Sequence, residues 1–132
     1  GPAYKKQSKT PRVLVGDLNV APHENDVWSH KQLLKIVSHT PGETERLEAS
    51  RNMAKFADIA RLAVPEDQKL YTWWSYRAKD WAASNRGRRL DHIWVNQAGL
   101  PDTLVDSYKI HLGWRGGWKP SDHAPVSVKI SV

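Results

Sequence analysis

Apolar and polar residues alternate most regularly near the end of the chain. Residues 126–132 place an apolar side chain at every second position, and residues 104–112 follow the same period with one interruption at Asp106. This period is typical of a strand with one buried face. Residues 89–95 also alternate and predict a third strand of this kind.

Two shorter segments predict strands without alternation. Residues 12–16 form a short, continuously apolar run, which is typical of a buried strand. Residues 70–74 are rich in aromatic side chains and predict a further strand. Between them, residues 17–31 contain Asp, Asn, His and Pro and predict a loop that is too polar for the core.

One segment carries a strong helix signal. Residues 40–43, Thr-Pro-Gly-Glu, have the pattern of a capping box with Pro at the first helical position. Pro65 must end the helix, but the pattern does not decide whether it breaks near Lys55 or continues to Leu62. Strand, helix and several strands in this order favour an α/β or α+β sheet layered with a helix. The expected apolar face of the helix comprises Leu47, Ser50, Met53, Ala54 and Ala57.

Length and composition restrict the class of protein. A chain of 132 residues suits one domain, and the absence of Cys excludes disulfides, thiolate nucleophiles and zinc-thiolate sites. No apolar run is long enough to span a bilayer, so we expect a soluble, intracellular protein. The first residues, Gly1-Pro2, are typical of a protease scar or the start of a fragment. Residues 1–11 are polar and basic, and we expect them to be poorly ordered.

Positive charge and tryptophan coincide along the chain. The net charge is +6, and residues 73–119 carry +4 together with six of the seven Trp residues. Interleaved cationic and aromatic side chains suit a nucleic acid. A solvated basic face over core aromatics would give the same pattern.

Two loops at strand ends hold the candidate chemistry. Asp17 and Asn19 follow the first strand and could hold a water, a cation or a phosphate oxygen, although the same pattern forms a simple Asx-turn. Asp122 and His123 precede the last strand. Asp91 lies inside an apolar strand, where a carboxylate needs a partner. That partner could be His123, or else a neighbouring arginine.

The sequence also restricts which metal ion the chain could bind. It contains neither a His-Glu-x-x-His motif nor a phosphate-binding Gly-rich loop ending in Lys-Ser/Thr. Ser121 has no evident base to activate it, which disfavours a serine triad. Oxygen ligands from Asp17, Asn19 and Asp122 suit Mg²⁺, with Mn²⁺ as an alternative.

Four segments together strongly resemble the exonuclease III family. They are Gly-Asp-Leu-Asn-Val-Ala-Pro at 16–22, Tyr-Thr-Trp-Trp-Ser-Tyr-Arg at 71–77, Asn-Arg-Gly-Arg-Arg-Leu-Asp-His at 85–92 and Lys-Pro-Ser-Asp-His-Ala-Pro-Val at 119–126. The resemblance covers residues 12–132 and only the C-terminal half of the family's domain. It implies an α/β fold, half of a four-layered sandwich, with a mainly antiparallel sheet and a covering helix.

The resemblance also implies roles for individual residues. Asp17 would orient or deprotonate the attacking water, with Asn19 beside it at the scissile phosphate. Asp91 would orient His123, which would stabilise the phosphate charge. Asp122, with Asp17, would bind the metal. The residues expected to contact DNA are Trp73, Trp74, Arg77, Arg86, Arg88, Arg89 and Trp118.

The function implied is that of a Mg²⁺-dependent DNA-repair phosphodiesterase, an abasic-site endonuclease and 3′–5′ exonuclease on duplex DNA. We expect it in the cytoplasm, associated with the nucleoid. Because half of the domain is missing, we expect the chain alone to be inactive and to need the N-terminal half, or self-association, to cover its sheet. The alternatives are a phosphatase or phospholipase of the same superfamily, and a non-catalytic nucleic-acid-binding module.

Overall fold

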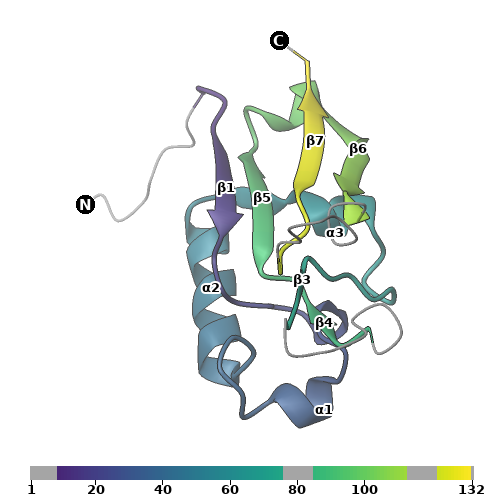
Figure 1. Ribbon diagram of the computed structural model, residues 1–132. Helices are drawn as coiled ribbons and strands as arrows, with labels where there is room; N and C mark the ends of the chain where they lie inside the picture. The colour runs from purple at the N-terminus through teal and green to yellow at the C-terminus, as the bar shows by residue number, and fades with distance from the viewer. Residues whose placement is uncertain (1–8, 76–84, 113–121, 132) are drawn as a thin grey trace, which may run out of the picture.

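The structure is a computed structural model that describes residues 9–75, 85–112 and 122–131. The expected disorder of residues 1–11 therefore falls largely outside the described residues. Strands and helices alternate along the first part of the chain, and strands dominate the second (Figure 1). In order, the elements are β1 (Val13–Asp17), η1 (Glu24–Asp26), α1 (His30–Leu33), α2 (Pro41–Met53), β2 (Phe56–Asp58), α3 (Ile59–Ala63), β3 (Trp73–Trp74), β4 (Gly87–Arg88), β5 (Asp91–Asn96), η2 (Leu100–Asp102), β6 (Thr103–Ile110) and β7 (Val126–Ile130).

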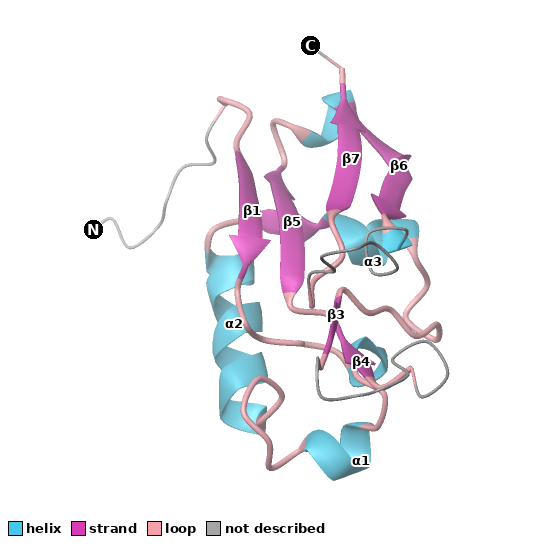
Figure 2. Cartoon of the chain, viewed as in Figure 1, coloured by secondary structure: helices cyan, strands magenta, loops and turns pink. Residues whose placement is uncertain are grey.

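The described strands form three antiparallel sheets. The largest has the order β1-β5-β2. The pairs β3-β4 and β6-β7 form the two others (Figure 2). Strand β5 is central, because β1 pairs along one edge of it and β2 along the other. The expected α/β architecture with antiparallel strands is confirmed.

The main core lies around β5, whose last five residues are buried. Ile93 and Val95 pack with Ile59 of α3, and Tyr108 and Val128 add to this cluster from β6 and β7. Helix α3 therefore covers the sheet, although the sequence pointed to the longer helix α2. No residue of α2 is buried, and Met53 on its expected apolar face is 67% exposed.

The start of α2 follows its capping sequence. The Thr40 hydroxyl accepts a hydrogen bond from the Glu43 backbone N–H, and the Glu43 carboxylate accepts one from the Thr40 backbone N–H. The helix ends at Met53, because Lys55 has a φ of 60°, which is incompatible with a continuing α-helix. The chain then enters β2, so the helix breaks near Lys55 and does not run on to Leu62.

Two expectations for the first part of the chain are wrong. Strand β1 is not buried, since Val13 is 45% and Val15 is 65% exposed at the edge of the sheet. Residues 17–31 are not a purely exposed loop, because they contain η1 and the first two residues of α1 and fully bury Asp26 and Val27. Among the described residues, no helix is long and apolar enough to cross a membrane.

Candidate active site

Two residues with positive φ shape the end of β1 and the loop that follows it. Gly16 has a φ of 150° and Asn19 a φ of 59°, and Gly and Asn are the residues that tolerate such values best. Between them, the Asp17 Oδ1 atom accepts a hydrogen bond from the Asn19 backbone N–H at 2.9 Å. The Asx-turn expected as an alternative is therefore present. The turn uses only the Oδ1 atom of Asp17, and Oδ2 takes no part in it.

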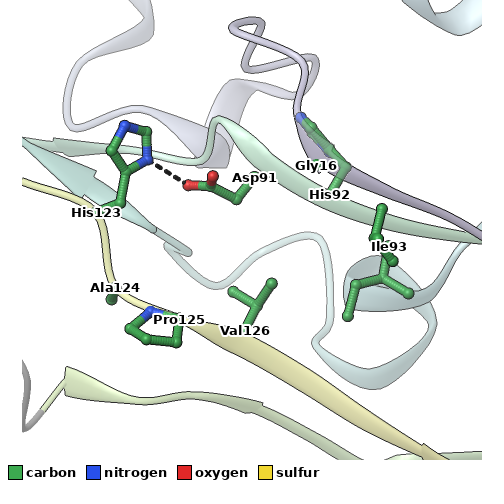
Figure 3. A pocket seen from close by; sticks show the side chains of 9 residues that line it. Gly16, Asp91, His92, Ile93, His123, Ala124, Pro125 and Val126 are labelled. Atoms are coloured by element: carbon green, nitrogen blue, oxygen red, sulfur yellow. Dashed lines mark hydrogen bonds and ion pairs between the residues drawn. The ribbon is translucent and has the colours of Figure 1, made fainter.

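Strand β5 brings a second carboxylate to the same place. Asp91 is the direct antiparallel partner of Asp17, at the end of the β1–β5 ladder. Its Oδ2 atom lies 2.8 Å from Nδ1 of His123 (Figure 3). Asp91 thus pairs with His123 and not with Arg88 or Arg89, which settles the alternative that its sequence context left open.

The backbone of residues 72–74 positions His123. The Trp74 N–H donates to the Asp122 carbonyl at 3.0 Å, and the Ala124 N–H donates to the Thr72 carbonyl at 2.7 Å. The Thr72 hydroxyl accepts from the backbone N–H groups of Leu90 and Asp91 at 3.0 and 3.1 Å. Residues 72–74 therefore join the loop that contains His123 to the start of β5.

His123 is surrounded by carboxylates. Its Nε2 atom lies 3.6 Å from Asp17 Oδ2 and 3.9 Å from Asp122 Oδ1. Partial burial lowers the pKa of His123, but the hydrogen bond and charge of Asp91 and the charges of Asp17 and Asp122 outweigh it, so the pKa is raised above its ordinary value. The imidazole is thus well placed to carry a positive charge.

Three of these side chains are also spaced to hold a cation. Asp17, Asp91 and His123 each offer one ligand atom, and these atoms lie within 4.8 Å of one another. Asp17 is the most open, with 43% of its side chain exposed. Asp122 lies at the margin of this group, and its Oδ2 accepts a hydrogen bond from the Trp73 indole N–H at 3.1 Å. The oxygen-rich donor set fits Mg²⁺ or Mn²⁺.

A cavity of about 460 Å³ opens beside the pair of Asp91 and His123. Its walls come from the end of β1, the start of β5 and the segment that leads into β7, and its lining combines the two site residues with mostly apolar side chains (Figure 3). The lining residues are Val15, Gly16, Asp91, His92, Ile93, His123, Ala124, Pro125 and Val126.

Two residues expected to contact DNA are in the wrong place to do so. Arg89 is completely buried, because its guanidinium pairs with both Asp26 and Asp58 at 2.8 to 2.9 Å. Trp74 is 3% exposed and its indole N–H donates to Asn85. A side chain that must leave the core before it reaches a phosphate or base cannot form part of a binding surface.

The other expected contact residues are either accessible or outside the described residues. Trp73 is half-buried, and the Arg88 guanidinium lies 5.3 Å from its ring. Arg86 is exposed and stacks 4.6 Å from the ring of Trp28, a residue that the sequence did not point to. Arg77 and Trp118 fall outside the described residues.

The sequence reasoning missed the buried polar residues behind the site. These are Asp26, Asp58 and His92, which surround Arg89. Asp58 follows Phe56-Ala57 and precedes Ile59-Ala60, so it sits in an apolar run much as Asp91 does. A carboxylate in such a run needs a buried partner, and this signal could have found it.

Comparison with known proteins identifies the family of the chain. The sequence model of the endonuclease/exonuclease/phosphatase family matches residues 3–123. The chain is 36% identical to the DNA repair nuclease APEX1 of Danio rerio over 95% of its own length and 38% of that protein. It is 33% identical to exodeoxyribonuclease III of Haemophilus influenzae over 88% of its length and 44% of that protein. The chain thus spans less than half the length of these relatives.

Solved structures show the same relationship. An AP endonuclease from Archaeoglobus fulgidus superposes with a TM-score of 0.86 at 27% identity, over 94% of this chain and 47% of that chain. A 3′ phosphatase from Neisseria, solved with a product DNA hairpin, gives a TM-score of 0.81 at 27% identity, over 91% and 45% of the two chains. The expected fold class is confirmed, and the chain belongs to the endonuclease/exonuclease/phosphatase family.

Proposed function

We propose that this chain is part of a Mg²⁺-dependent DNA-repair phosphodiesterase that cuts duplex DNA at abasic sites and degrades it from 3′ ends. The observation that carries the proposal is the position of His123, whose two ring nitrogens face Asp91 and Asp17 at 2.8 and 3.6 Å. The relatives and solved neighbours, whose names include a DNA repair nuclease, an exodeoxyribonuclease and an AP endonuclease, support the reaction class.

The proposal gives each residue a role, and the contacts of Asp91, His123 and Asp17 support theirs. Asp91 fixes the orientation of the His123 ring, so that Nε2 points toward Asp17 and donates to a phosphate oxygen. Asp17 accepts a proton from the attacking water or orients that water. Asn19, two residues further on, supplies an amide at the scissile phosphate.

The negative charge around His123 supports a bound cation. Asp17 and Asp122, whose oxygens lie 3.6 and 3.9 Å from the same His123 nitrogen, would hold Mg²⁺, and Mn²⁺ suits the same oxygens. Asp91 and His123 stay paired with each other in this proposal and do not act as ligands. The cation, when bound, neutralises charge on the phosphate and its leaving oxygen. The side chains of this chain then have to place the phosphate, hold the water and keep the imidazole in position.

Arginines and an indole beside the site supply contacts to duplex DNA. Arg86 is exposed, and Arg88 and Trp73 are partly accessible and lie together. Arg77 and Trp118 belong to the same proposal on the basis of the family resemblance alone. Contacts of this kind neutralise phosphates and make binding fall with salt. Such an enzyme would work in the cytoplasm on nucleoid DNA.

The exposed sheet face supports the proposal that the chain needs a partner. Val13 and Val15 on β1 are 45% and 65% exposed, and Val15 also lines the cavity. Large exposed apolar patches are rare on monomers. We propose that the N-terminal half of the same nuclease domain covers this face and that the chain alone is inactive. Self-association through the face is the alternative, and light scattering of the isolated chain distinguishes it from a monomer.

The decisive experiment combines the chain with the N-terminal half of the domain. The mixture should nick a duplex with one abasic site when Mg²⁺ is present, and should not do so in EDTA or when either half is omitted. Turnover by this chain alone at ordinary enzyme rates would contradict the proposed need for a partner. Release of phosphate from a lipid head group, without cleavage of the duplex, would favour the phosphatase or phospholipase alternative.

A further inference from the structure

Behind the site, His92 is buried with both ring nitrogens in use. It is 1% exposed, its Nδ1 lies 3.2 Å from Nη1 of Arg89, and its Nε2 lies 2.7 Å from the carbonyl oxygen of Val20. A guanidinium can only donate, so Nδ1 must accept. The ring proton is therefore on Nε2, which donates to the Val20 carbonyl.

The Val20 carbonyl belongs to the loop that carries Asp17 and Asn19. The Leu18 N–H donates to the Leu90 carbonyl at 3.0 Å, and the Ala21 N–H donates to the Ser38 carbonyl at 2.8 Å. The bond from His92 lies between these two. It is a side-chain bond that ties this loop to β5, one residue after the left-handed Asn19.

The His92 ring is itself held in place. Arg89 is fixed on two sides by the carboxylates of Asp26 and Asp58, so the donor that faces His92 Nδ1 cannot move away. Turning the ring over would set a carbon toward Val20 and leave a partly buried carbonyl without this partner, which is unfavourable. The ion pairs behind the site thus define both the orientation and the tautomer of His92.

Two neighbouring residues of β5 therefore contact the two loops that form the site. Asp91 pairs with His123, and His92, on the opposite side of the strand, bonds the loop that carries Asp17. We propose that His92 is a positioning residue for the active site, which holds the Asp17–Asn19 loop at the distance from His123 that cation and phosphate binding need. This inference rests on the proposed function of the site.

The test compares three variants of the chain. His92→Phe keeps a ring in the space but removes both bonds, whereas His92→Gln retains an amide donor near the position of Nε2. Thr103→Val is the matched control, because it removes another bond from a buried side chain to a backbone carbonyl, the 2.8 Å bond to Gly99, at the far end of the β6–β7 ladder.

Amide hydrogen exchange measures the loop directly. Loss of the anchor in His92→Phe should speed exchange at Leu18 and Ala21 by about tenfold or more, while Ala124 on the other side of the site keeps its rate. His92→Gln should restore slow exchange, and Thr103→Val should leave both loop amides unchanged. Equal exchange at Leu18 and Ala21 in the wild-type chain and His92→Phe would overturn the proposal.

Binding of Mn²⁺, followed by broadening of the His123 ring signals, gives the functional readout. His92→Phe should weaken Mn²⁺ binding about 10- to 100-fold, the usual range for residues that orient metal ligands, and His92→Gln should recover most of it. Unchanged binding in His92→Phe would also overturn the proposal. If the wild-type chain binds no Mn²⁺ near His123, the proposed cation chemistry fails, and the exchange rates still decide the role of His92.

Discussion

Two clusters of carboxylates lie on either side of the start of β5, and they differ in how their charge is balanced. In the buried cluster, Asp26 and Asp58 face Arg89, and Arg61 adds a second contact to Asp26. In the open cluster, Asp17, Asp91 and Asp122 face a single imidazole, that of His123. Within the described residues, neither Lys nor Arg forms an ion pair with these three.

From this difference we propose that the buried cluster stabilises the fold and that the open cluster is the functional one. Burial without compensation is costly, so the buried carboxylates are matched with guanidinium groups and have no capacity left for a ligand. The open cluster has more negative charge than its histidine can neutralise and is partly exposed to solvent. Such a site favours a cation, and the imbalance is what the proposed reaction requires.

The largest effect should come from breaking the buried cluster. Arg89→Met leaves two buried carboxylates without their main partner and should lower the free energy of unfolding by about 3–5 kcal/mol. Urea denaturation followed by circular dichroism measures it. Arg86→Met, which removes an exposed arginine, should stay within about 0.5 kcal/mol of the wild type. A similar small change for Arg89→Met would show that the cluster does not stabilise the fold.

Acid should act on the same cluster. Burial raises the pKa of Asp26 and Asp58, but the charge and hydrogen bonds of Arg89 outweigh it, so both pKa values are lowered in the folded state. The stability that these groups add is complete above the unfolded carboxyl pKa of about 3.9 and is lost as the pH falls below it. Unfolding free energies measured between pH 6 and pH 2 should show this fall, with a shallower slope in Asp26→Asn. Equal slopes would contradict the assignment.

A change of pH should act on the open cluster through the protonation of His123. Its raised pKa means that it adds stability below the unfolded pKa of 6.5 and loses it as the pH rises through the folded value. The Asp91→Asn variant lacks the carboxylate charge beside His123 and makes a weaker hydrogen bond to its ring. The pKa of His123, measured by NMR in EDTA, should therefore be lower than in the wild type. Asp102→Asn, which changes an exposed carboxylate on η2, is the control and should leave it in place. If His123 had the same pKa in Asp91→Asn as in the wild type, its pairing with Asp91 could not be what raises that pKa.

The smallest effect should be seen at the surface. If Arg86 neutralises one phosphate, Arg86→Met lowers the slope of log K against log salt by about 0.9 for duplex binding by the combined halves. Lys129→Met, at the exposed end of β7, should keep the wild-type slope. Fluorescence anisotropy at several salt concentrations measures both. Equal slopes in the two variants would remove Arg86 from the DNA-binding surface.

Local signals in the sequence predicted the parts of the structure that depend on local chemistry. The Thr40 capping box, the alternation in β6 and β7 and the need of Asp91 for a partner all depend on a few neighbouring residues. The exposure of Val15 could not be predicted, because it depends on what lies against the sheet. Arg88 and Arg89 look alike in the sequence, and only the distant carboxylates Asp26 and Asp58 make one of them buried.

The central claim is that Asp17 and His123 form part of a site that cleaves phosphodiesters, and cleavage by the combined halves tests it most directly. Asp17→Asn and His123→Ala should each reduce nicking of abasic-site duplex by about 10²- to 10³-fold, the usual cost of losing one preorganised group. Duplex affinity and folding should be retained in both variants. Nicking at the wild-type rate in either variant would contradict the account.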